Sequence, residues 1–212
     1  MDPPGGWKQP YLIYTGPCEH GYVTRLILAS SSPRRRLLLS AAGFEFSIRS
    51  PDVDEQILRD EEPDRMVVRL AGEKAIAAEA RDGLVALGAD TTVVLDGLIL
   101  GKPTDNAGAA DMLLSIAGRT HLVLTGWAIA ADGTVIEDGF DTSLVSMRSV
   151  TREEADAYAE SGEPLDKAGA YALQGEGARF VSGVAGSRSN VIGLPLKPIV
   201  AALRRAGIEP TR

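Results

Sequence analysis

A run of hydroxyl and guanidinium side chains directly follows the first apolar segment of the chain. Residues 25–29 read as a short buried strand, and Ser30, Ser31 and Ser32 then precede Pro33 and three arginines. A strand that leads into a helix N-terminus presents free backbone N–H groups and the positive end of the helix dipole, which together suit a phosphate group. The alternative is a capped helix with a solvated basic face, because Ser32 is a good N-cap and Pro33 suits the first helical position.

Asp90 is the second candidate for chemistry. It follows the apolar segment 84–88 and precedes two threonines, so we expect it at the end of a strand. Ligands of α/β sheets gather at the carboxyl ends of strands. An aspartate in that place can bind a divalent metal or take a proton from water. The alternative is an aspartate that only ends a strand in a turn.

Five further charged residues are scattered along the chain: Glu55, Lys74, Lys102, Asp166 and Lys167. Lys74 falls on the otherwise apolar stripe of a predicted helix, which is unusual unless its ammonium group reaches a polar site. Taken singly, each residue is typical of a charged surface. Taken together, the lysines and arginines would hold a polyphosphate, and the carboxylates would hold a metal that neutralises it.

The composition excludes several classes of protein. The 22 Lys and Arg residues against 29 Asp and Glu residues give a net charge of −7, which argues against a general nucleic-acid binder. No apolar run approaches the roughly 18–20 residues that span a bilayer. Cys18 is the only cysteine, so an internal disulfide and a multi-cysteine zinc site are excluded, and we expect a cytoplasmic protein. Of the two histidines, His20 lies near the start of the chain and His121 is interpreted as structural.

Helical and strand patterns interleave, which predicts an α/β fold with a mixed, twisted sheet and flanking helices. Residues 1–22 lack an amphipathic period and are interpreted as a flexible extension, and residues 23–212 as one domain. Helices are expected from Ser32 to Gly43, from about residue 63 to 82, from 104 or 105 to 116, after the capping box of Thr151 and Glu154, and from 196 to 207. Strands are expected at 25–29, 44–48, 84–88, 93–95, 98–100 after the Asp96-Gly97 turn, 121–130, 133–137, 141–148 and 179–184.

Eight ordered motifs between about Thr24 and about Ala206 resemble the Maf family of nucleoside triphosphate pyrophosphatases. They are LASSSPRR at 28–35, VDE at 53–55, EKA at 73–75, GADT at 88–91, GKP at 101–103, DKAGAY at 166–171, LQG at 173–175 and NVIGLP at 190–195. The resemblance implies a fold similar to that of inosine triphosphatases, with two lobes around a deep nucleotide cleft. It also implies a homodimer.

The resemblance further implies hydrolysis of a nucleoside triphosphate to the monophosphate and pyrophosphate, with Mg²⁺, Mn²⁺ or Co²⁺ as the cofactor. Asp90 matches the proton acceptor of the family. Arg34, Thr91 and Gln174 match the branch that prefers dTTP and UTP, whereas a second branch, which prefers 7-methyl-GTP, has Trp, Gln and Glu at these places.

Physical chemistry distributes the remaining roles within this resemblance. The groups expected to hold phosphates are Ser30, Ser32, Arg35, Lys74, Lys102 and Lys167. Glu55 and Asp90 are expected to share the metal, and which of them takes the proton stays open. Two alternatives remain: a 7-methyl-GTP pyrophosphatase, or a nucleotide-binding regulator of septum formation without significant hydrolysis.

Overall fold

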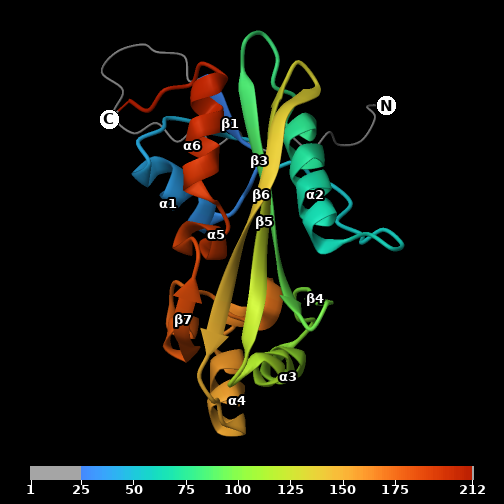
Figure 1. Cartoon of the computed structure of the whole chain (residues 1–212), viewed down its shortest axis with the longest axis vertical. Helices are drawn as coiled ribbons and strands as arrows, with labels where there is room; N and C mark the ends of the chain where they lie inside the picture. The colour runs from blue at the N-terminus through green and yellow to red at the C-terminus, as the bar shows by residue number, and fades with distance from the viewer. Residues whose placement is uncertain (1–24, 212) are drawn as a thin grey trace, which may run out of the picture.

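A seven-stranded mixed sheet organises the computed structural model, which describes residues 25–211 (Figure 1). The predicted extension 1–22, with Cys18 and His20, lies outside the described residues. The sheet order is β2-β1-β3-β5-β6-β7, with β4 paired to β3; β1 is parallel to β2 and β3, and the other pairs are antiparallel. The strands are β1 (Leu26–Leu28), β2 (Ser47–Ile48), β3 (Val85–Leu95), β4 (Leu98–Leu100), β5 (Thr120–Ala131), β6 (Thr134–Met147) and β7 (Val181–Ala185). The predicted mixed α/β fold is confirmed.

Six α-helices and three 3₁₀ segments flank this sheet within the described residues. The α-helices are α1 (Pro33–Ala41), α2 (Pro63–Ala77), α3 (Asn106–Ile116), α4 (Arg152–Glu160), α5 (Arg188–Ile192) and α6 (Leu196–Arg205); the 3₁₀ segments are η1 (Glu163–Asp166), η2 (Ala168–Ala170) and η3 (Glu176–Phe180). The predicted caps of α1, α3 and α4 form at Ser32, at Asp105 and in the capping box of Thr151 and Glu154. None of the helices in residues 25–211 is long and apolar enough to cross a membrane.

Three long strands, β3, β5 and β6, run through both halves of the elongated molecule (Figure 1). In one half, α1 and α6 pack against one face of the sheet and α2 against the other. In the other half, α3 and α4 lie with η2 around a second apolar core that contains Tyr158 and Phe180. The three strands therefore connect the two cores and pass through the region where the halves meet.

The sequence prediction of two strands at 133–137 and 141–148 is wrong, because both belong to the single strand β6. The intervening residues keep pairing with β5, and Gly139 lies opposite Trp127. A Cβ built at Gly139 would lie 3.0 Å from the Trp127 ring, so the missing side chain makes room for the indole. The glycine, which weakens a strand pattern in the sequence, here accommodates a cross-strand aromatic group.

Helix α2 lies in backbone contact with the sheet. A Cβ at Gly88 of β3 would lie 2.1 Å from the carbonyl oxygen of Ala71, and one at Gly126 of β5 would lie 2.3 Å from the backbone of Val67. These two glycines let the helix approach more closely than side chains would permit. The closeness matters for function, because Lys74 on this helix then reaches a strand residue directly.

Helix α2 also ends earlier than predicted, at Ala77 rather than near Asp82. Arg49, from beyond β2, donates to the carbonyl oxygens of Ala78 and Glu79 at 2.8 and 3.0 Å. These bonds satisfy acceptors that the end of a helix leaves free. The predicted stop at Asp82 and Gly83 instead forms the turn that leads into β3. The stop signal was therefore a turn signal for the next strand.

Candidate active site

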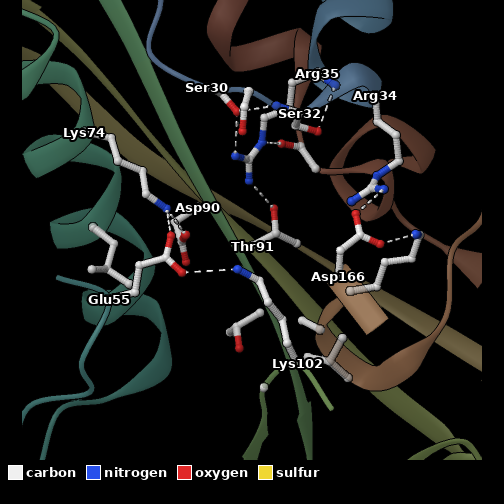
Figure 2. A pocket seen from close by; sticks show the side chains of 18 of the residues that line it. Ser30, Ser32, Arg34, Arg35, Glu55, Lys74, Asp90, Thr91, Lys102 and Asp166 are labelled. Atoms are coloured by element: carbon white, nitrogen blue, oxygen red, sulfur yellow. Dashed lines mark hydrogen bonds and ion pairs between the residues drawn. The ribbon is translucent and has the colours of Figure 1, made fainter. Parts of the chain in front are cut away.

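Among residues 25–211, the middle of β3 has a partner strand on one side only. Strand β1 pairs with β3 as far as Leu87 and β4 begins to pair at Val93, while β5 covers the other edge from Ala86 to Val94. A cavity of about 840 Å³ lies along this bare segment (Figure 2). Its volume is in the range of small-molecule binding sites.

Asp90 lies within β3 and not at a strand end, so that sequence expectation is wrong. Thr91 and Thr92 are β-branched and continue the strand into the apolar run of residues 93–95. Successive side chains of a strand point to opposite faces, so Asp90 faces α2, on the same side as Gly88, whereas Thr91 faces α1. The contacts agree, because Asp90 bonds to Lys74 of α2 and Thr91 to Arg35 of α1.

Two carboxylates converge on one ammonium group on the α2 side of the cavity (Figure 2). Lys74 Nζ donates to Asp90 Oδ1 and to Glu55 Oε1, each at 2.6 Å. The side chains of Lys74 and Asp90 are 11% and 14% exposed, so water screens their attraction little. Lys102 Nζ donates to Glu55 Oε2 at 3.3 Å. Burial alone would raise the pKa of Glu55, but the hydrogen bonds and charges of Lys74 and Lys102 outweigh it and hold that pKa below its ordinary value.

Arg35 ties three segments together on the α1 side of the cavity. Its Nε donates to the carbonyl oxygen of Gly193 at 2.8 Å, and its two terminal nitrogens donate to Ser30 Oγ at 3.2 Å and Thr91 Oγ1 at 3.1 Å. Thr91 Oγ1 also lies 3.0 Å from Oγ1 of Thr125, its cross-strand neighbour on β5. Burial lowers the pKa of Arg35, which still leaves the guanidinium charged at neutral pH. Each terminal nitrogen keeps one N–H that none of these bonds uses.

The two halves of the molecule meet at the mouth of the cavity. Arg34 on α1 pairs with Asp166 Oδ2 on η1 at 3.8 Å (Figure 2). Lys167 donates to Oδ1 of the same carboxylate. Gln174 also lines the cavity, with an exposed side chain. The segment that carries Asp166, Lys167 and Gln174 connects α4 to β7 and closes the side of the cavity opposite α2.

The cavity brings together every site residue that the sequence singled out. Its lining includes Ser30, Ser32, Arg34, Arg35, Glu55, Lys74, Asp90, Thr91, Lys102, Lys167 and Gln174. Sequence reasoning missed Thr125 and the unpaired edge of β3. Thr125 carries no signal of its own, because only its register opposite Thr91 brings it near the site. His121 is buried and bonds Tyr171 at 2.8 Å, which agrees with its structural interpretation.

The oxygen donors at the α2 side suit a hard divalent cation. Within residues 25–211, no group of three or more His, Cys, Asp or Glu residues forms a metal site. Glu55 and Asp90 supply two carboxylates, and Mg²⁺ is commonly held by one or two carboxylates together with water and substrate phosphates. The donor set therefore fits a cation whose coordination the substrate completes.

A family model and curated relatives match most of this chain. The dTTP/UTP pyrophosphatase of Anaeromyxobacter dehalogenans (strain 2CP-C) is 47% identical over 186 residues, which cover 86% of this chain and 94% of the relative. The dTTP/UTP pyrophosphatase of Geotalea uraniireducens (strain Rf4) is 49% identical over 188 residues, covering 87% and 96%. A solved HAM1 protein from Coxiella burnetii aligns with a TM-score of 0.40 at 17% identity, over 57% of this chain and 72% of that one. The family model described as Maf-like protein matches residues 25–206, so this chain belongs to the Maf-like family.

Proposed function

We propose that this protein hydrolyses dTTP and UTP to the nucleoside monophosphate and pyrophosphate. The observation that carries the proposal is the position of Asp90 on the unpaired segment of β3, where it faces a cavity lined by cationic side chains. Lys74 bonds one oxygen of this carboxylate, and no group in residues 25–211 hydrogen-bonds the other. Support also comes from relatives named dTTP/UTP pyrophosphatases, which this chain matches over more than nine-tenths of their length.

The cations around the cavity are suited to a triphosphate. Arg34, Lys102 and Lys167 approach it from three different segments, and the N-terminus of α1 adds backbone N–H groups beside Ser30. Triphosphate cleavage needs charge neutralisation and an oriented water more than covalent chemistry from the protein. We therefore assign these groups to phosphate binding. We assign two tasks to Arg35: its remaining N–H groups bind phosphate, and its hydrogen bond to Ser30 Oγ holds that hydroxyl in place.

Asp90 is assigned the proton of the attacking water. Lys74 holds one oxygen of this carboxylate at 2.6 Å, which fixes its orientation and leaves the second oxygen for the water. When bound, a divalent cation would neutralise charge on the phosphates, with Glu55 and Asp90 as its protein donors. Mg²⁺, Mn²⁺ and Co²⁺ are the ions to compare for activity.

The base specificity is assigned to Arg34, Thr91 and Gln174. Arg34 and Gln174 line the cavity from opposite halves of the molecule. Thr91 contributes differently, because its hydroxyl is engaged by Arg35 and Thr125. We infer that Thr91 acts on specificity indirectly, through the hydrogen bonds that engage its hydroxyl, and not by a direct hydrogen bond to the base.

A substrate panel with product analysis tests the reaction and the substrate together. The purified protein is incubated with dTTP, UTP, 7-methyl-GTP and GTP and a divalent cation, and the products are separated by ion-exchange chromatography. We expect dTMP and UMP with pyrophosphate, at higher kcat/KM than for either guanine nucleotide. Release of nucleoside diphosphates and orthophosphate would contradict the proposed reaction. A preference for 7-methyl-GTP would contradict the substrate assignment. Nucleotide binding without turnover would favour the alternative of a nucleotide-binding regulator of septum formation.

A homodimer and a cytoplasmic location complete the proposal. Three apolar side chains lie four residues apart on the exposed face of β6: Ile136, Phe140 and Leu144, which are 53%, 48% and 45% exposed. A second copy of the chain would cover this apolar surface. Sedimentation velocity of the wild type and of Phe140→Asp tests the dimer: we expect the variant to sediment as a monomer, and a monomeric wild type would contradict it. Cell fractionation tests the location.

A further inference from the structure

The loop that carries Gln174 is folded around one carboxylate. Glu163 Oε1 accepts hydrogen bonds from the backbone N–H of Gly177 at 3.0 Å and from the Tyr158 hydroxyl at 2.9 Å. Its other oxygen, Oε2, accepts from the backbone N–H of Glu176 at 3.0 Å. Three donors from α4 and from the far end of the loop thus meet on the side chain of Glu163, which does not itself line the cavity.

The two glycines that flank Glu176 show how tightly the loop closes on this carboxylate. A Cβ at Gly175 would lie 2.6 Å from Glu163 Oε2, and a Cβ at Gly177 would lie 2.5 Å from the Tyr158 hydroxyl oxygen. Gly175 also has a φ of +95°, which L side chains rarely adopt. A side chain at position 175 or 177 would therefore clash with Glu163 or Tyr158 in this conformation of the loop.

Gln174 itself is placed by its backbone. Its side chain is exposed to the cavity, and no group in residues 25–211 hydrogen-bonds its amide. The preceding residues Tyr171, Ala172 and Leu173 are buried and hold one side of the loop by apolar contact. The other side is held by hydrogen bonds from the backbone of Glu176 and Gly177 to the Glu163 carboxylate. Removing that contact frees the loop on one side of Gln174.

Glu163 is also joined to the phosphate side of the cavity. Lys167 Nζ donates to the carbonyl oxygen of Glu163, so one residue supports a cation and the glutamine loop together. Burial alone would raise the pKa of Glu163, but the bonds from Glu176, Gly177 and Tyr158 outweigh it, and the pKa lies below its ordinary value. The carboxylate is therefore ionised at neutral pH and accepts all three bonds at once.

We propose that Glu163 is a positioning residue for base selection: its carboxylate fixes the loop of residues 171–177 so that Gln174 faces the bound nucleobase, without contact between Glu163 and substrate. The inference rests on the proposed function, because it assigns Gln174 to the base. Two nearby residues then have different roles: Lys167 binds the phosphates, and Glu163 positions the residue that selects the base.

The substitution E163Q tests this directly, because glutamine keeps the size of the side chain but turns one acceptor into a donor that faces a backbone N–H. We expect the ratio of kcat/KM for UTP to that for GTP to fall about tenfold, the scale of one lost hydrogen bond to a ligand. E163D retains the charge on a shorter side chain and should give an intermediate ratio. The matched control is E154Q, since Glu154 in the same half accepts bonds from Thr151 and Arg148 away from the cavity and should leave the ratio unchanged.

A double variant distinguishes positioning from general damage. In a Q174A background the UTP to GTP ratio has already fallen, so adding E163Q should not lower it further. The ratio of Kd values for UMP and GMP, measured by calorimetry, should change in parallel without reference to turnover. If the UTP to GTP ratio is unchanged in both E163Q and E163D, including the case in which kcat/KM falls equally for both triphosphates, the inference is overturned while the wild-type activity stands. Absence of UTP hydrolysis by the wild type would instead contradict the proposed function, and the inference with it.

Discussion

Replacement of Lys74 by methionine removes the one ammonium group that two carboxylates share. Methionine is nearly as long as lysine and keeps the apolar contacts of the stem with α2 and the sheet, so the variant isolates the charge. Asp90 loses its partner at 2.6 Å, and Glu55 keeps only Lys102, at 3.3 Å. Two negative charges then face each other across the place where the ammonium group lay.

The expected loss of stability follows from the burial of the cluster. At 2.6 Å and an effective dielectric of about 20, each pair has a gross attraction of about 6 kcal/mol, most of which replaces lost hydration. Removal of one partner from a buried pair costs about 3–5 kcal/mol. Because the Glu55 side chain is 44% exposed and can turn to water, we expect the lower end, about 3 kcal/mol, or a fall in Tm of roughly 6–12 °C.

The effect should depend on pH in a defined direction. The folded-state pKa of Glu55 is lowered, so its stabilising contribution is present above the ordinary value of 4.5 and is lost as pH falls through the folded-state pKa. The difference in free energy of unfolding between wild type and Lys74→Met should therefore be full at pH 7 and smaller below about pH 4. Urea denaturation at both pH values measures it, with the exposed Lys197→Met as the control. A difference at pH 7 no larger than that of the control would refute the reasoning.

Three further predictions concern the frame around the site. Gly88→Ala should push α2 away from the sheet and lower both Tm and activity, with a fall in Tm of several degrees. The control is Gly72→Ala, whose Cβ would meet only Val135 at 3.4 Å and which should leave Tm unchanged or raise it. Equal changes of Tm in the two variants would contradict the close contact between α2 and the sheet. Burial lowers the pKa of His121 to about 4, so the unfolded chain takes up a proton first as pH falls from 6.5, and the free energy of unfolding should drop by up to about 3 kcal/mol by pH 4. His121→Phe should remove this pH dependence when the free energy of unfolding is measured by urea denaturation at pH 6.5 and pH 4. A variant whose free energy of unfolding still falls as much as that of the wild type would contradict the prediction. Deletion of residues 1–22 should leave kcat/KM for UTP unchanged, since the family match starts at residue 25; a large loss would place part of the site in that segment.

Local signals in the sequence predicted the helix starts and turns well. Ser32 caps α1, and Thr151 with Glu154 forms the capping box of α4, because these patterns act between residues three positions apart. The turn at Asp96 and Gly97 forms between β3 and β4 for the same reason. Features decided within a few residues are readable from one chain alone.

The site residues gather around one cavity as expected, but individual contacts between distant residues were not readable. Arg35 matches a motif for phosphate binding, but the sequence did not indicate its bonds to Thr91 and Gly193, which span 56 and 158 residues. Asp90 was expected at a strand end because polar residues follow an apolar run, whereas pairing with β5 carries the strand through it. Glu163 lies in a short segment without a chemical motif, and only the fold brings the backbone of Gly177 to it.

The turnover of Asp90→Asn tests the central claim most directly. Asparagine keeps the shape and most hydrogen bonds of Asp90 but cannot take a proton from water at neutral pH. With UTP and Mg²⁺ we expect kcat to fall by roughly 10²-fold or more, the scale of losing a general base, while the variant stays folded by circular dichroism and still binds UMP. A folded Asp90→Asn protein that keeps most of its turnover would contradict the assignment and would make Glu55 the candidate for the base.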